Sequence, residues 1–294
     1  MRDPLFFRFF FLLGLGLFFL SLELLHLPSL RRSIHFAILS HWVRLLAVTL
    51  VIACSCKLVV LPTTPFGLLL ATGAGGWFLF ESMALWRSIH RFAMHCTPLF
   101  PAYTVLADEN CWPNVPELRP AQNLLKNSGF TLECIARSDS TGPQLLICLV
   151  FRSTDDNSRL FLRLPCPAQP PALPSALVCS GTADGRMLLT ENFAGVFAGY
   201  YPSNWDVVRR PLCQNLAALL ALHGRRQRHC QLVPVGKDPM EQLNGMQREL
   251  YETNRSRAFF VCSQKDSRDC LSADAGFRIW MESLLLRYLG RPLA

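Results

Sequence analysis

Residues 42–86 read WVRLLAVTLVIACSCKLVVLPTTPFGLLLATGAGGWFLFESMALW, and this stretch decides the fold class. It contains two apolar runs, at about 42–62 and 66–86, which are separated only by residues 63–65 (Thr-Thr-Pro). A helix rises about 1.5 Å per residue, so each run is long enough to cross a hydrocarbon core of about 30 Å. The short connection predicts a tight helical hairpin.

A third apolar run, at about 5–25, precedes the hairpin. A signal peptide is the competing interpretation, because Arg2 and Arg8 resemble a positively charged leader. Residues 21–29 lack the small-residue pattern of a cleavage site. We therefore expect an uncleaved transmembrane helix here and a membrane region over residues 1–96.

The remainder of the chain has a different charge content. Residues 1–96 hold 3 acids and 8 bases, whereas residues 97–294 hold 18 acids and 21 bases. A chain that is 51% hydrophobic is not disordered. We expect an interfacial segment and linker at 97–120 and a soluble domain over 121–294, which is long enough to bury its own core.

Strand-like runs dominate the first half of this domain and helix-like runs the second half. Short β-type runs lie at 130–137, 144–152, 160–164, 176–179, 187–190, 231–235 and 258–262. Helical patterns lie at 121–128, 192–200, 211–223, 238–253 and 272–289. The fold class expected is an α+β soluble domain, a β-meander followed by helices, attached to an N-terminal bundle of two or three transmembrane helices.

Two of the expected helices carry specific signals. Asp238, followed by Pro239 and by Glu241, is a good N-cap arrangement. In the last helix, apolar residues recur at helical spacing, while Arg278, Glu282 and Arg287 are expected to face outward. The expected buried face of that helix consists of Phe277, Trp280, Met281, Leu284, Leu285 and Tyr288.

Basic residues orient the membrane region. They flank the first connection and follow the third run, and the hairpin tip between the runs has no charge. The positive-inside rule then places the soluble domain in the cytoplasm and the N-terminus outside, in a plasma or inner membrane. The residues concerned are Arg31, Arg32, Arg44, Arg87 and Arg91.

Lys57 and Glu81 are the charged residues inside the hairpin runs that invite a functional interpretation. Counted from the tip, they differ in depth by about 16 Å, which argues against a direct pair. We expect two tolerated charges near the membrane surfaces. An ion or proton path is the alternative.

Small residues recur at every fourth position on the third run, at Gly67, Ala71 and Gly75. Such a face permits close helix packing. We expect it to pack within the hairpin, and a homodimer formed through the transmembrane helices is the alternative.

One cluster of basic residues in the soluble domain is a candidate binding surface. A solvated helix end explains it, and contact with anionic lipid headgroups is the functional alternative. The small positive surplus of the domain does not favour nucleic acid. The residues are Arg209, Arg210, Arg225, Arg226 and Arg228.

No motif specifies a reaction. The 12 cysteines include no C-x-x-C pair, and we expect reduced structural thiols, with disulfides the alternative in an oxidising compartment. Cys213 and His223 lie about 15 Å apart along one expected helix, too far for a catalytic pair. There is no nucleophile elbow, Walker A or Rossmann pattern, and we expect neither a cofactor nor a metal.

The sequence therefore predicts a multi-pass membrane protein whose cytosolic α+β domain acts as an interaction or scaffold module. Its expected partners are the lipid bilayer and another protein, and nucleic acid is not expected. The main alternative is a membrane-tethered enzyme, such as a thiol-dependent hydrolase, that acts at the membrane surface. A small transporter subunit built on Lys57 and Glu81 is the third hypothesis.

Overall fold

The chain forms two compact units. The computed structural model describes residues 4–26, 33–93, 100–106, 119–138, 146–165, 175–262 and 269–293. Residues 1–93 and 276–294 make one unit, here called the helical unit, and residues 94–275 make the other, the sheet unit. The C-terminal residues, which the sequence analysis assigned to the soluble domain, thus pack with the N-terminal helices.

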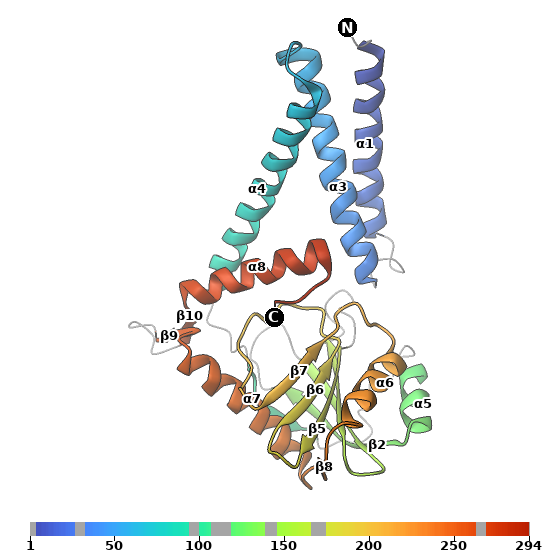
Figure 1. The fold of residues 1–294 in the computed structure, drawn as a ribbon, viewed down its shortest axis with the longest axis vertical. Helices are drawn as coiled ribbons and strands as arrows, with labels where there is room; N and C mark the ends of the chain where they lie inside the picture. The colour runs from blue at the N-terminus through green and yellow to red at the C-terminus, as the bar shows by residue number, and fades with distance from the viewer. Residues whose placement is uncertain are drawn as a thin grey trace. The chain divides into compact units, whose positions relative to one another are not determined.

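The helical unit contains three helices that are long and apolar enough to span a membrane. They are α1 (Pro4–His26), α3 (Ile34–Ser55) and α4 (Phe66–Ala93). Figure 1 shows α3 between the other two. A short π-helical turn, η1 (Cys56–Val60), extends α3 to the hairpin tip. α3 begins well before the expected position 42, and α4 continues past the expected position 86.

The close contacts between these helices occur at glycines other than the predicted ones. A Cβ added to Gly14 would lie 3.1 Å from the carbonyl oxygen of Ala47, and one added to Gly73 would lie 3.3 Å from that of Thr49. The face formed by Gly67, Ala71 and Gly75 is exposed, and a Cβ on either glycine would meet nothing within 4 Å. This face therefore does not pack inside the hairpin as expected.

The two hairpin charges have separate roles. The ammonium group of Lys57 donates hydrogen bonds to the carbonyl oxygens of Pro62 and, at 2.7 Å, of Thr64. It therefore satisfies two backbone carbonyls of the hairpin tip, between η1 and α4. Glu81 instead faces α8 (Ala273–Leu289), the last helix of the chain.

Glu81 joins three helices of the helical unit. Its carboxylate accepts a hydrogen bond from the phenol of Tyr288 and lies 3.4 Å from Arg287 and 3.3 Å from His41. The indole N–H of Trp42 donates to the carbonyl oxygen of Tyr288 at 2.9 Å. The Glu81 side chain is only 11% exposed. The expectation of a tolerated charge near a membrane surface is therefore wrong for Glu81, because this residue links helices inside the unit.

The outward face expected of α8 is also corrected by the structure. Glu282 is buried, and Arg287 lies beside Glu81, whereas Phe277, expected to be buried, is exposed. The expectation followed from the apolar period alone. It failed because the polar residues of this helix have partners inside the protein.

The sheet unit is built on one mixed sheet. The neighbours run β1-β2-β3-β4-β5-β6-β7, all antiparallel except the parallel pair β6–β7, and β8 pairs with the end of β5. The β-meander predicted from the sequence is confirmed in β2 to β6. The strands are β1 (Tyr103–Val105), β2 (Phe130–Ser138), β3 (Leu146–Ser153), β4 (Arg159–Pro165), β5 (Ser175–Thr182), β6 (Met187–Glu191), β7 (Trp205–Arg209) and β8 (Leu232–Val233). A separate hairpin pairs β9 (Phe260–Cys262) with β10 (Asp269–Leu271).

Helices cover both faces of this sheet (Figure 1). α5 (Arg119–Asn127) and α6 (Leu216–Gln227) pack on one face through Leu125 and Leu219. α7 (Pro239–Ser256) packs on the other, and Asp238 caps it as predicted by accepting hydrogen bonds from the first backbone amides. The architecture is therefore α+β, with a buried core on each side of the sheet.

The helix predicted at 192–200 is wrong. This segment is an irregular loop, in which Ala198 has a φ of 50° and is buried. Asn254 on α7 holds the loop, because its side chain bonds to both the backbone N–H and the carbonyl of Tyr200. The helical spacing of the aromatic residues instead reflects a loop that turns them toward the sheet.

Candidate ligand-binding cavity

The central strand β4 reads RLFLRLP and presents two arginines to a buried face. Leu160, Leu162 and Leu164 point to the core under α5 and α6. Because side chains alternate along a strand, Arg159, Phe161 and Arg163 point to the opposite face, which α7 covers. Charged groups in such a position need partners, because burial of an unpaired charge is costly.

Arg159 is fully buried and fully paired. Its guanidinium forms a bidentate pair with Glu133 at 2.6 and 3.0 Å and donates to the carbonyl oxygen of Gly236 at 2.8 Å. It also donates to the side chain of Gln242 on α7. Glu133 lies at a register shift between Leu132 and Cys134, and such a bulge re-aims a side chain. This arginine therefore has a structural role.

Arg163, four residues along the same strand face, has no such partners. The residue as a whole is half-buried, its Nε atom is buried without a hydrogen-bond partner, and Arg163 has no hydrogen bond or ion pair with a described residue. Burial opposes its charge, but Tyr103 and Glu191 act in the other direction, and the pKa of Arg163 lies above its ordinary value. A permanently charged donor thus lines the cavity without a hydrogen-bond partner for its buried Nε atom.

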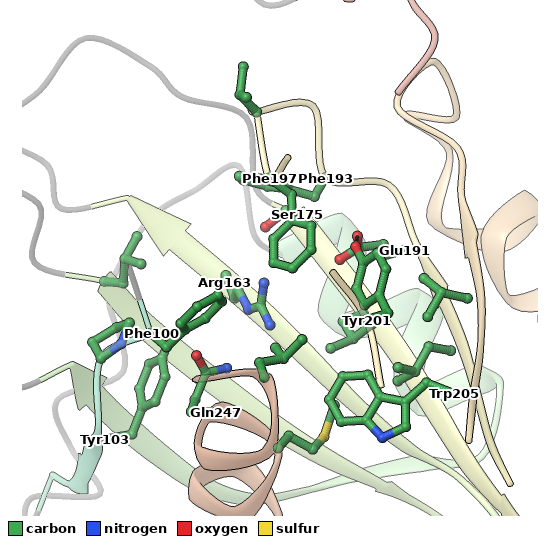
Figure 2. A pocket seen from close by; sticks show the side chains of 18 residues that line it. Phe100, Tyr103, Arg163, Ser175, Glu191, Phe193, Phe197, Tyr201, Trp205 and Gln247 are labelled. Carbon is green, nitrogen blue, oxygen red and sulfur yellow. Dashed lines mark hydrogen bonds between the residues drawn. The ribbon is translucent and has the colours of Figure 1, made fainter. Parts of the chain in front are cut away.

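That space is a cavity of about 290 Å³ between the sheet and α7. Figure 2 shows the Arg163 guanidinium among the lining side chains, with Phe100 and Tyr103 on one side and Glu191 and Tyr201 on the other. Strands β1, β4, β5, β6 and β7, the loop before β7 and helix α7 all contribute to its wall. The lining residues are Phe100, Pro101, Tyr103, Leu146, Arg163, Ser175, Leu177, Leu189, Glu191, Phe193, Val196, Phe197, Tyr201, Trp205, Val207, Met246, Gln247 and Leu250.

Glu191 in the cavity wall is already paired. Its carboxylate lies 3.0 Å from the Nε of Arg209, its register neighbour on β7, and accepts a hydrogen bond from the phenol of Tyr201 at 2.9 Å. Arg209 also donates to the carbonyl oxygen of Gly195 at 2.9 Å. Arg209 is not among the lining residues, but counted together Arg163, Arg209 and Glu191 carry a surplus of one positive charge.

The rest of the wall is mainly aromatic. Phe197 stacks on Tyr201 with ring centroids 4.5 Å apart, and the Arg209 guanidinium lies 5.9 Å from the ring centroids of Phe193 and Phe197. Burial raises the pKa of Tyr103, so its phenol stays protonated at neutral pH. An apolar cavity with a few placed polar groups is the usual form of a small-molecule site.

The arginines predicted to touch the membrane divide into two groups. Arg209 is inside the sheet unit beside Glu191, and Arg226 donates to the carbonyl of Leu189 and to Thr190 and Asp206. The other three predicted residues, Arg210, Arg225 and Arg228, are exposed. Lipid contact through these three stays a prediction.

A buried serine–histidine pair lies elsewhere in the sheet unit. Ser180 Oγ is 3.0 Å from His223 Nε2, and Thr190 Oγ1 is 2.9 Å from His223 Nδ1. These distances suit a nucleophile and its base, but Ser180 and Thr190 are fully buried and His223 is 2% exposed. None of them lines the cavity. The network therefore holds α6 on the sheet.

Three thiols of the sheet unit are poor candidates for the nucleophile of a thiol-dependent enzyme. Burial raises the pKa of Cys134 to about 11, and it raises the pKa values of Cys148 and Cys179 to about 12. Such thiols are poor nucleophiles because the reactive thiolate is scarce. Cys96, Cys111, Cys166 and Cys262 lie outside the described residues or have undescribed side chains.

In the described part of the chain, no group of three or more His, Cys, Asp or Glu side chains is placed to hold a metal ion. The chain matches no known protein family, no curated protein and no solved structure. The cavity must therefore be interpreted from its own chemistry.

The cavity was not predicted from the sequence, although one signal was present. Residues 160–164 have the pattern of a strand, and arginines at 159 and 163 alternate with its leucines. A strand that is apolar on one face and reads Arg-Phe-Arg on the other places charge in the interior when both sheet faces are covered. The partners of those arginines come from distant segments and could not be read from spacing.

Proposed function

We propose that this protein is a membrane-anchored interaction module whose sheet unit recognises a small molecule in the cavity at Arg163. The observation that carries the proposal is the Arg163 guanidinium in an aromatic cavity, because its buried Nε atom has no hydrogen-bond partner. Native proteins rarely leave a buried polar group unsatisfied, and an absent ligand is one explanation of such a group. A bound acceptor satisfies it.

The anchor in this proposal is the set of helices α1, α3 and α4. Their length and hydropathy support insertion, and the basic residues at the connections support a cytoplasmic sheet unit. A small-molecule module held at a membrane can report the concentration of its ligand to a protein partner in the same membrane. The scaffold role expected from the sequence then becomes a ligand-dependent interaction.

The test is direct binding to the full-length protein in detergent micelles. Three naphthalene-sized probes, 2-naphthoate, 2-naphthylmethanol and 2-naphthylmethylammonium, are titrated by calorimetry. We expect at least one probe to bind with a stoichiometry of one. Val207→Phe fills the cavity from β7 and is expected to abolish binding.

Val208→Phe is the matched control, because Val208 is the next residue on the same strand and is not part of the cavity wall. It is expected to bind the probe as the wild type does. Binding that survives in Val207→Phe, or no binding of any probe to a folded wild-type protein, contradicts the proposal.

A further inference from the structure

We infer that the cavity takes a monocarboxylate with an apolar body of about a dozen carbon atoms, an assignment that rests on the proposed function. Three properties of the cavity decide this class of ligand: its charge, its size and the shape of its wall. Each can be read from the described residues.

The charge of the wall selects a single negative charge on the ligand. Glu191 is ion-paired with Arg209 at 3.0 Å, so Arg163, Arg209 and Glu191 together carry one net positive charge. One carboxylate balances that charge and can accept two hydrogen bonds from a guanidinium. A phosphate monoester carries about −1.5 to −2 charges at pH 7 and would leave the buried site negative.

The volume sets the size of the apolar body. An engineered cavity of about 150 Å³ binds benzene, so a cavity of 290 Å³ holds roughly twice as many carbon atoms, about twelve. The site therefore lies at the small end of the range for ligand sites, about 300–1,000 Å³. A diacyl lipid does not fit in this volume.

The wall favours a flat body. Six aromatic residues line the cavity, and rings pair favourably with other rings in offset or edge-on contacts. A planar conjugated acid can contact several of them at once, whereas a flexible chain loses rotational freedom on binding. The aromatic residues are Phe100, Tyr103, Phe193, Phe197, Tyr201 and Trp205.

The test compares probes that share one body and differ in their polar group. 2-Naphthoate, 2-naphthylmethanol and 2-naphthyl phosphate are titrated into the full-length wild type in detergent. We expect the carboxylate to bind at least tenfold more tightly than either of the others. A hydrogen bond to a charged group supports a preference of about 10- to 100-fold.

Arg163→Met tests the residue that is assigned to the carboxylate. It is expected to remove this preference, so that 2-naphthoate binds no more tightly than 2-naphthylmethanol. Arg210→Met is the matched control, because Arg210 is exposed and outside the cavity, and it is expected to keep the preference. If Arg163→Met fails to fold, the comparison of the three probes on the wild type still tests whether the cavity prefers a carboxylate.

The outcomes separate this inference from the proposed function. Equal binding of the alcohol and the carboxylate, tighter binding of the phosphate, or a preference that persists in Arg163→Met overturns the monocarboxylate but keeps a small-molecule site. No binding of any probe overturns both.

Discussion

The phenol of Tyr288 on α8 donates a hydrogen bond to the carboxylate of Glu81 on α4, across 207 positions of the sequence. Trp42 on α3 fixes the same residue from its other side through the Tyr288 carbonyl oxygen. These contacts make the C-terminal helix part of the helical unit. Glu81, which the sequence places near a membrane surface, therefore holds α8 against α4.

Tyr288→Phe removes that hydrogen bond and leaves Glu81 with less support. We expect the free energy of opening of the last turns of α8 to fall by about 1–3 kcal/mol, because a charged acceptor with low exposure loses its donor. Hydrogen exchange of the α8 amides in detergent measures this change. Leu289→Ala, at an exposed neighbour, is the control and is expected to change it by less than about 0.5 kcal/mol.

The two arginines of β4 give a matched prediction on stability. Arg159→Met leaves Glu133 without its bidentate partner and is expected to destabilise the sheet unit by about 3–5 kcal/mol. Arg163→Met removes a cation that has no hydrogen-bonded partner among the described residues, and it is expected to lower the free energy of unfolding by only about 1 kcal/mol or less. The free energies of unfolding of the two variants are compared by urea unfolding that is monitored through hydrogen exchange of the β3 and β5 amides.

Equal destabilisation by the two substitutions would contradict this reading of β4. An Arg163→Met protein that stays folded but no longer binds the ligand would show that Arg163 serves binding more than stability.

His223 predicts how stability depends on pH. Burial, with a smaller effect of Arg226, lowers its pKa from 6.5 to about 4 in the folded protein. Between these values the unfolded chain binds more protons, so stability is complete above pH 6.5 and falls as the pH drops toward 4. The loss attributable to this residue is about 3 kcal/mol over the window.

The protection of α6 amides, measured across this range of pH, checks the prediction. In His223→Gln we expect the free energy of unfolding to depend less steeply on pH. The slope should fall by the amount that corresponds to about one proton, because glutamine does not titrate. An unchanged slope in that variant would show that other groups cause the acid sensitivity.

Helix packing in the helical unit is tested at two glycines of α4. A side chain at Gly73 meets the backbone of Thr49, so Gly73→Val is expected to separate α3 from α4 and destabilise the hairpin. A Cβ at Gly75 has no atom within 4 Å, so Gly75→Val is expected to leave the packing of α3 on α4 unchanged. Disulfide cross-linking between α3 and α4 reports the packing.

The same pair of variants tests the homodimer left open by the sequence. If the exposed face at Gly67, Ala71 and Gly75 joins two copies, Gly75→Val will lower the dimer fraction in analytical ultracentrifugation. An unchanged oligomeric state rejects this face as an interface.

Local signals in the sequence were sufficient for many elements of the fold. The Asp238 cap and Pro239 located the start of α7, and Gly129, which has a φ of 74°, marked the end of α5. The strand-like runs at 176–179 and 187–190 form the paired strands β5 and β6. Each of these signals acts over a few residues, so each is visible without the tertiary structure.

Features set by distant residues were not predictable in this way. The loop at 192–200 has helical spacing, yet Asn254 holds it in an irregular conformation. Glu81 was interpreted as a surface charge because its partners lie on α3 and α8. The cavity depends on residues from β1 to α7, and no local pattern brings them together.

Topology is the prediction on which the membrane proposal depends. A variant with a single added cysteine at the exposed position Arg228, and with the native cysteines replaced, is treated with a membrane-impermeant maleimide. We expect labelling only after the cells are permeabilised, which places the sheet unit in the cytoplasm. Labelling of intact cells would reverse the orientation.

A crystal structure of the full chain with 2-naphthoate tests the proposed ligand site most directly. We expect ligand density between the sheet and α7, with a carboxylate oxygen within hydrogen-bond distance of Arg163 Nε and the ring among Phe100, Phe197 and Trp205. An empty or collapsed cavity at saturating probe, or an Arg163 guanidinium paired with a residue of the chain itself, would contradict it.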